Sequence, residues 1–328
     1  MKVKRDKTID IIRGILICLV ILGHAVEAQS KIHRYIYGFH MPCFFLISGY
    51  LNVYDSTVSM KEYSKKIARR YVRPYFIYSA VFFVLTGLNI KDIARTLLGG
   101  RWNITVYSFP FWFINVLALS LIVIKCFLTK LSFKSFYVVA VFFWIVAHFF
   151  SSFLHNTSLP WGIEFLPVSI FYMATGMVLR KFNLYGSDIA NKVKIVSLCI
   201  MAFETILFVK LGSTYLYDLN SYNLGNGIND ILIPLAAFYS LGCIARLVVK
   251  CFRLSNCVEC IGQASSTLFF THGFLICFYK KVLPKAILNE WIVASLCIVS
   301  GLVIYYLAYK NKTLRAFWHK IKKKVIKI

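Results

Sequence analysis

The sequence predicts an all-α membrane protein, a polytopic transmembrane helical bundle. Hydrophobic residues make up 59% of its 328 residues, and the mean hydropathy of +0.68 is far above that of a soluble domain. Apolar runs repeatedly reach the roughly 20 residues that a helix needs to cross a bilayer. The net charge of +25 does not indicate nucleic-acid binding, because the cations are spread over loops that flank the apolar runs.

We expect about ten membrane-spanning helices in one domain, residues 1–309, followed by a basic cytoplasmic tail, 310–328. Segments assigned to the cytoplasmic side hold 28 of the 38 Lys and Arg residues. The positive-inside rule therefore places both termini on the cytoplasmic side of the cell membrane. The tail would attract anionic lipid. The expected spans are 9–27, 39–54, 72–89, 109–128, 135–153, 160–180, 193–211, 228–247, 265–283 and 290–309.

The first span contains two ionisable side chains, Arg13 and His24. Eleven residues separate them, so on a helix they lie about 20° apart around the axis and about 16.5 Å apart along it. An ionisable group costs roughly 2.5 to 3.5 kcal/mol inside a span, which indicates a functional site facing a polar cavity. The same stretch resembles a secretory signal, but Arg13 would interrupt its apolar core, so we expect no cleavage.

The second span opens with a histidine, His40, and a helix-perturbing proline, Pro42. Its Ser48-Gly49 pair allows a close approach of another helix, and Ser48 is also a candidate contact for a substrate. The connection from Asp55 to Arg73 carries six cations and ends in Arg73-Pro74, and a proline suits the first turn of the third span.

The remaining segments give weaker signals. The polar, tyrosine-rich segment 212–229 suits either a surface facing sugars or an interfacial belt with turns. Cysteines show no disulfide framework, and the lone Cys257-x-x-Cys260 pattern is weak support for a metal, so we expect none. His33, His148, His155 and His319 are assigned to packing or to the membrane interface.

Several motifs resemble the acyltransferase-3 family of integral membrane acyltransferases, which move acyl groups onto cell-envelope glycans and related acceptors. Arg13, ten residues and His24 reproduce the family's Arg-x10-His signature. The other similar segments are Phe39-His40-Met41-Pro42, Phe44 to Gly49, Arg69-Arg70 with Arg73-Pro74, Phe111-Trp112-Phe113, and Gly262 to His272.

The resemblance implies an acyl-CoA donor, with acetyl the family's common acyl group, and a hydroxyl acceptor on an envelope saccharide or lipid-linked glycan. Arg13 would form a cationic mouth for the CoA phosphates together with the cations at 69, 70 and 73. His24 would act as a general base or carry the acyl group covalently, and the sequence leaves both routes open. The resemblance also makes His40, Trp112 and His272 candidate substrate contacts.

Three carboxylates are further candidates. Glu27 would orient the His24 imidazole or lie solvated at the end of the span, whereas Glu164 and Glu204 are costly in lipid unless they face the bundle interior. We take Glu164 as a candidate acceptor contact.

Two other classes of function compete with an acyltransferase. A transporter or flippase would also use an intramembrane Arg and His, but the sequence has no obvious inverted repeat. A sensor or scaffold would not need Arg13 and His24 on one helix face.

Overall fold

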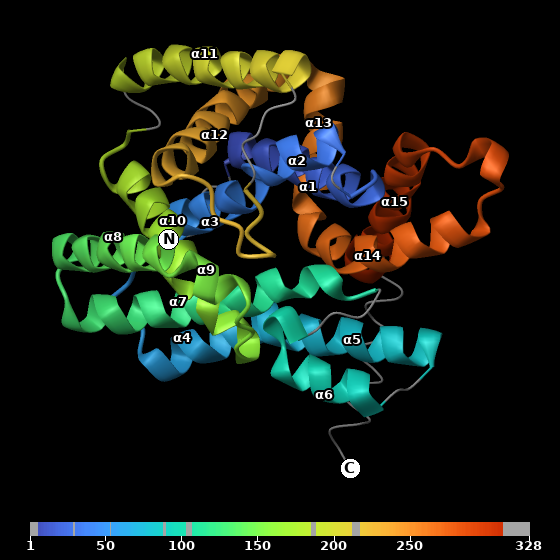
Figure 1. Cartoon of the computed structure of the whole chain (residues 1–328), viewed down its shortest axis with the longest axis horizontal. Coiled ribbons are helices and arrows are strands. Elements are labelled where there is room, and N and C mark those ends of the chain that lie inside the picture. Colours follow the sequence, from blue (N-terminus) through green and yellow to red (C-terminus); the bar gives the residue numbers. More distant parts are fainter. Residues whose placement is uncertain are drawn as a thin grey trace.

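The computed structural model describes residues 6–28, 30–52, 54–87, 90–102, 107–184, 188–211 and 217–310 (Figure 1). Helices dominate, and this part of the chain contains no strand beyond a β-bridge between Asp218 and Asn223. The basic tail from residue 311 lies outside the described residues. The α-helices are α1 (Lys7–Ala25), α2 (Lys31–Tyr37), α3 (His40–Leu51), α4 (Met60–Ile67), α5 (Arg73–Thr86), α6 (Ile90–Leu98), α7 (Trp112–Lys130), α8 (Phe133–Phe149), α9 (Ser151–His155), α10 (Leu166–Lys181), α11 (Asp188–Leu211), α12 (Gly227–Lys250), α13 (Phe252–Gln263), α14 (Ser265–Val282) and α15 (Glu290–Tyr305).

Short helical turns of other types complete the structure. Two are π-helical, η1 (Ala68–Val72) and η6 (Tyr306–Lys310). The 3-10 turns are η2 (Gly100–Trp102), η3 (Phe109–Phe111), η4 (Pro160–Phe165) and η5 (Lys285–Ile287).

Within the described residues, five helical segments are long and apolar enough to cross a membrane, or six if the bent pair α13 and α14 counts as one span. The five are Lys7–Ala25, Phe109–Lys130, Pro160–Lys181, Gly227–Lys250 and Glu290–Tyr309. The helical membrane fold is therefore confirmed, whereas ten spans and the side of each terminus stay predictions. Helix α3, in the expected span 39–54, has 12 residues and is about 18 Å long, shorter than a bilayer core of about 30 Å.

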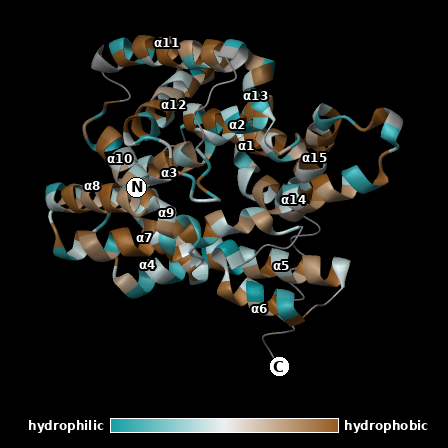
Figure 2. Ribbon diagram, in the orientation of Figure 1, coloured by the Kyte–Doolittle hydropathy of each residue, from teal (hydrophilic) through white to brown (hydrophobic). Residues whose placement is uncertain are grey.

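Large hydrophobic side chains cover much of the outer surface of the bundle. Val84, Phe149 and Leu247 expose 79%, 84% and 64% of their surface. Figure 2 shows hydrophobic residues along the outer helices as well as inside the bundle. Exposed apolar surface of this extent suits contact with lipid.

Helix α1 lies at the centre of the bundle and contacts α2, α3, α12, α13, α14 and α15 (Figure 1). Glycines make its approach to α13 possible, because a Cβ at Gly14 would overlap the Val258 carbonyl oxygen and one at Gly262 would overlap that of Asp10. Helices α3 and α10 pack in the same way through Gly49 and Gly176, as the Ser48-Gly49 pair predicts. Central packing fixes the direction in which Arg13 and His24 point.

A π-helical turn joins α4 to α5, so residues 60–86 form a continuous helix where the sequence suggested a loop up to Arg73. Pro74 explains this turn. Its missing N–H and its ring exclude an ordinary helical hydrogen bond to the Arg70 carbonyl, and the Arg73 N–H reaches back to the Ala68 carbonyl instead. The inserted residue rotates the arginines of this turn relative to a regular helix.

Candidate active site

Two cavities follow the helix α1 face that carries Arg13 and His24. The larger has a volume of about 360 Å³, within the range of small-molecule sites, and we call it the Arg13 cavity. Its cationic lining residues are Arg13, Lys66 and Arg70, and its polar ones include Ser48, Tyr63 and Ser265. The smaller, the His24 cavity, has a volume of about 20 Å³ and is lined by Val20, His24, Tyr37, His40, Met41, Phe109, Pro110, Trp112, Asp218, Leu219, Asn220 and Phe269.

The Arg13 guanidinium is held in place by two neighbours. Its Nη2 donates a hydrogen bond of 2.7 Å to Ser265 Oγ at the start of α14, and its Nη1 lies 3.5 Å from Asp10 Oδ1, one turn back on α1. The side chain still exposes 24% of its surface. Arg13 is therefore fixed in direction and remains accessible from the cavity, where Lys66 and Arg70 add two further positive charges.

His24, in the last turn of α1, lies at the centre of an aromatic cluster. Its ring centroid is 5.2 Å from that of His272 in a stacked arrangement and 4.8 Å from that of Phe109 edge to face. Tyr37 is 5.6 Å away edge to face, and Tyr37 itself lies 4.8 Å from His40. Residues from α1, α2, α3 and α14 thus gather around one imidazole, and His272 on α14 is more than 200 positions from His24 in the sequence.

Hydrogen bonds to backbone carbonyls fix the tautomers of two of these histidines. His40 Nδ1 lies 2.8 Å from the Ile36 carbonyl oxygen, and His272 Nδ1 lies 2.8 Å from that of Phe269. A carbonyl only accepts, so Nδ1 carries the proton in both rings and Nε2 presents a lone pair. His272 Nε2 is buried without a hydrogen-bond partner, and His272, although predicted to contact the substrate, lines neither cavity.

Tyr37 sets the orientation of His24. The Tyr37 hydroxyl and His24 Nδ1 are 2.8 Å apart. When Nδ1–H donates to the Tyr37 oxygen, His24 Nε2 carries a free lone pair, which is the form that accepts a proton from a substrate. Glu27, the sequence candidate for this orienting role, is exposed beyond the end of α1.

The structure divides the other residues predicted for the site. Ser48 lines the Arg13 cavity and Trp112 the His24 cavity. Arg69 and Arg73 line neither cavity, although Arg70 between them does. Glu164 also lines neither; its Oε2 accepts a hydrogen bond of 3.2 Å from the Leu159 N–H and closes the η4 turn.

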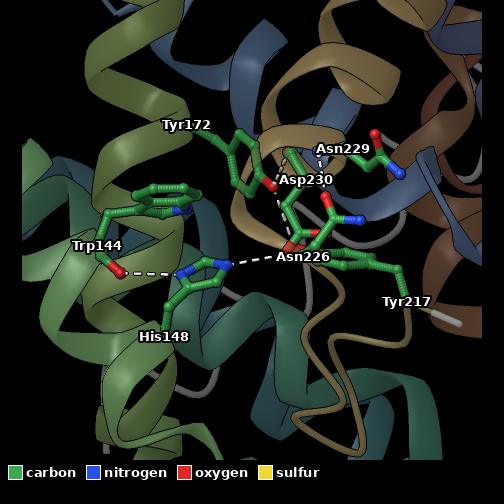
Figure 3. A network of polar contacts seen from close by, with 7 residues as sticks. All are labelled: Trp144, His148, Tyr172, Tyr217, Asn226, Asn229 and Asp230. Atoms are coloured by element: carbon green, nitrogen blue, oxygen red, sulfur yellow. Dashed lines mark hydrogen bonds and ion pairs between the residues drawn. The ribbon is translucent and has the colours of Figure 1, made fainter. Parts of the chain in front are cut away.

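A largely buried pair of side chains, His148 and Asp230, joins α8 to α12 (Figure 3). His148 Nδ1 lies 3.0 Å from the Trp144 carbonyl oxygen and its Nε2 lies 2.7 Å from Asp230 Oδ2. These two contacts, one with a backbone carbonyl and one with the buried Asp230 side chain, fix the direction of the His148 ring. His148 also packs on the Trp144 ring, with centroids 4.1 Å apart, and it lines neither cavity.

The pair of His148 and Asp230 is connected to the 217–226 segment. The Tyr172 hydroxyl donates to the Asp230 carbonyl oxygen at 2.6 Å and lies 3.2 Å from the Tyr217 hydroxyl (Figure 3). Tyr217 immediately precedes Asp218, which lines the His24 cavity. Part of the polar, tyrosine-rich segment 212–229 thus lies beside His24, while 212–216 lie outside the described residues.

Sequence reasoning missed several lining residues. Tyr37, Ser265 and Asp218 carried no role in the predicted site, yet the first two bond His24 and Arg13 directly. Ser265 lies within the Gly262 to His272 motif, so that motif was the available signal, whereas Tyr37 had none beyond its place just before His40. In the described part of the chain, no group of three or more His, Cys, Asp or Glu side chains forms a metal site.

Comparison with known proteins identifies the family. The acyltransferase domain of the acyltransferase-3 family matches residues 6–310. The chain belongs to this family. The match covers nearly the whole chain, and the apolar helices agree with an integral membrane protein.

Two curated relatives share part of the sequence, both called nodulation protein NolL. The one from Sinorhizobium fredii (strain NBRC 101917 / NGR234) is 32% identical over 121 residues, which cover 30% of this chain and 32% of the relative. The one from Mesorhizobium japonicum (strain LMG 29417 / CECT 9101 / MAFF 303099) is 30% identical over 136 residues, covering 34% and 36%. The chain thus spans about a third of the length of these relatives. No solved structure matches it.

Proposed function

We propose that this enzyme transfers an acetyl group from acetyl-CoA to a hydroxyl of a cell-envelope saccharide, in the cell membrane. The observation that carries the proposal is the arrangement of two cavities along one helix, with Arg13 in the first and His24 in the second. The donor enters the Arg13 cavity, and the acceptor hydroxyl reaches the His24 cavity.

The charges of the Arg13 cavity suit a CoA ester. Arg13, Lys66 and Arg70 supply three cations for phosphate oxygens, and arginine forms paired hydrogen bonds with such groups. The remaining lining is largely apolar, as the pantetheine arm and acyl group require. Arg69 and Arg73, grouped with Arg70 in the sequence, have a smaller role because they do not line this cavity.

The polar lining of the His24 cavity suits a hydroxyl acceptor. Asp218 and Asn220 supply hydrogen-bonding groups of the kind that bind sugar hydroxyls, and Trp112 supplies an aromatic face. Glu164 makes no contact with this cavity, so we do not assign it to the acceptor.

His24 is the general base of the proposed reaction. Its Nε2 takes the proton of the acceptor hydroxyl while that oxygen attacks the thioester carbonyl, a contribution of about 10² to 10⁴ in rate. The C–S bond then breaks and the proton passes to the departing CoA sulfur. Tyr37 holds the imidazole in position through its hydrogen bond to Nδ1, and His272 stacks on the His24 ring from behind the cavity lining. A covalent acyl-histidine route uses the same residues and is distinguished by trapping a labelled protein in the absence of acceptor.

The test is CoA release from acetyl-CoA by the purified protein in nanodiscs, with and without crude envelope glycan. We expect glycan to stimulate release. Removing a charged hydrogen-bond donor costs about 1.5 to 3 kcal/mol, so Arg70→Ala should raise the acetyl-CoA KM by roughly tenfold or more. Arg69→Ala is the matched control, with the same charge change one residue away and a smaller effect on KM.

A thermal unfolding transition shows whether the purified protein is folded. If folded protein released no CoA from acetyl-CoA or from longer acyl-CoAs, the proposal would be refuted. If Arg70→Ala and Arg69→Ala had equal acetyl-CoA KM values, the assignment of the donor to the Arg13 cavity would be wrong, whereas the proposed acetyl transfer itself would not be affected.

A further inference from the structure

The two cavities lie end to end along the same four helices. On α1, Ile17 lines the Arg13 cavity and Val20, one turn further, lines the His24 cavity. On α3 the corresponding residues are Phe44 and Met41. Less than one helical turn of packed side chains therefore separates the place proposed for the donor from the place proposed for the acceptor.

Phe269 on α14 is the residue that lines both cavities among the described lining residues. Its side chain is buried, with 7% of its surface exposed. On the side of the Arg13 cavity its ring packs against Phe113, with centroids 5.5 Å apart. On the other side it meets the His272 ring at 5.7 Å, and His272 in turn stacks on His24. The order in space is Phe113, Phe269, His272 and His24.

The space beyond Phe269 is very small. The His24 cavity, at about 20 Å³, has room for little more than one water molecule. An acyl group that reaches His24 from the Arg13 cavity must pass the Phe269 ring and then fit into the space next to it. Each added methylene must displace packed atoms, which is costly in a close-packed interior.

We propose that Phe269 is a partition between the donor and acceptor cavities and that its side chain limits the donor to short acyl groups. The inference rests on the proposed function and deepens it, since it names the residue that selects the acyl chain. In the resting protein the ring also separates the thioester from water that enters beside His24.

Two consequences follow from removing the ring. Phe269→Ala joins the cavities and opens a space of benzene-like dimensions for longer acyl chains. It also lets water reach the thioester without an acceptor. In that side reaction a water oxygen attacks the carbonyl, the C–S bond breaks, and the products are a free carboxylic acid and the CoA thiol.

The experiment measures kcat/KM for acetyl-CoA and butyryl-CoA with excess glycan, and CoA release without glycan. One methylene in an apolar pocket changes selectivity by about 10- to 200-fold. We expect Phe269→Ala to raise the ratio of butyryl to acetyl kcat/KM at least tenfold over wild type and to increase release without glycan. Phe269→Leu, which keeps most of the volume, gives a smaller shift in the same direction and guards against loss of folding in the larger truncation.

Phe270→Ala is the matched control. Phe270 is the next residue on α14 and is 1% exposed, but its ring packs against Tyr78 at 4.7 Å and it lines neither cavity. This variant should keep the wild-type acyl preference. If both Phe269 variants have the same acyl profile and background release as wild type and Phe270→Ala, the partition inference is wrong. Failure of wild type to release CoA at all would instead refute the proposed function.

Discussion

Replacing Tyr37 by phenylalanine tests how His24 is oriented. The substitution removes the hydroxyl that lies 2.8 Å from His24 Nδ1 and leaves the ring, so the stacking around the site is kept. In the active tautomer Nδ1–H donates to this oxygen. Leaving a partly buried donor without a partner costs about 1 to 3 kcal/mol, and we expect this cost in the tautomer that acts as base.

A cost of this size corresponds to a fall in kcat of about 5- to 150-fold. The acetyl-CoA KM should change little, because Tyr37 lines the His24 cavity and not the Arg13 cavity. The assay is steady-state CoA release in nanodiscs with saturating glycan.

Tyr35→Phe is the control for this substitution. Tyr35 lies on the same helix, and its hydroxyl pairs with Thr205 Oγ1 at 2.8 Å, outside both cavities. It should keep the wild-type kcat. A Tyr37→Phe enzyme with wild-type kcat, or with the whole loss in the acetyl-CoA KM, would refute the orienting role of Tyr37.

Three further predictions concern stability and are measured as thermal unfolding in detergent. Gly49→Ala should destabilise by about 1 to 3 kcal/mol, because its Cβ overlaps the α10 backbone, whereas Gly23→Ala meets only side-chain atoms and should cost less; equal costs would contradict this packing. Asp230→Leu should cost about 1 to 3 kcal/mol by leaving His148 Nε2 without its hydrogen-bond partner, and adding His148→Leu should recover part of this cost; no recovery would argue against the pairing of these two side chains. Burial lowers the pKa of His33, so the unfolded chain binds more protons than the folded one and stability rises with pH up to about 6.5. His33→Gln should weaken this rise, and an unchanged slope of stability against pH would exclude a contribution from His33.

Helical periodicity was sufficient to place Arg13 and His24 on one face of a helix. The structure places them on α1, each lining a cavity. This could be predicted because both residues lie in one regular helix, where spacing alone determines direction. The all-helical fold could be predicted for a similar reason, since long apolar runs leave few other ways to satisfy the backbone in lipid.

The division of the arginines at 69, 70 and 73 could not be predicted from spacing. It depends on the π-helical turn that Pro74 imposes, which shifts the phase of the helix at Arg70. The predicted grouping treated the three as equal members of a loop.

Contacts between segments that are distant in the sequence could not be predicted either. His148 and Asp230 are 82 positions apart, and neither lies in a motif. The approach of Asp218 to His24 depends on how the 217–226 segment folds back over the bundle, and the 75° bend between α13 and α14 depends on how both pack against α1. Such geometry is set by tertiary packing, which local patterns do not encode.

In the proposed reaction, acyl transfer takes place at His24. The most direct test is transfer of radiolabelled acetyl from acetyl-CoA to envelope glycan by wild type and by His24→Gln, with acetyl-CoA binding measured on both proteins. We predict that wild type labels the glycan and that His24→Gln binds acetyl-CoA with similar affinity but loses at least 100-fold in labelling, the lower end of a general base's contribution. Glycan labelling by His24→Gln at the wild-type rate would contradict the account.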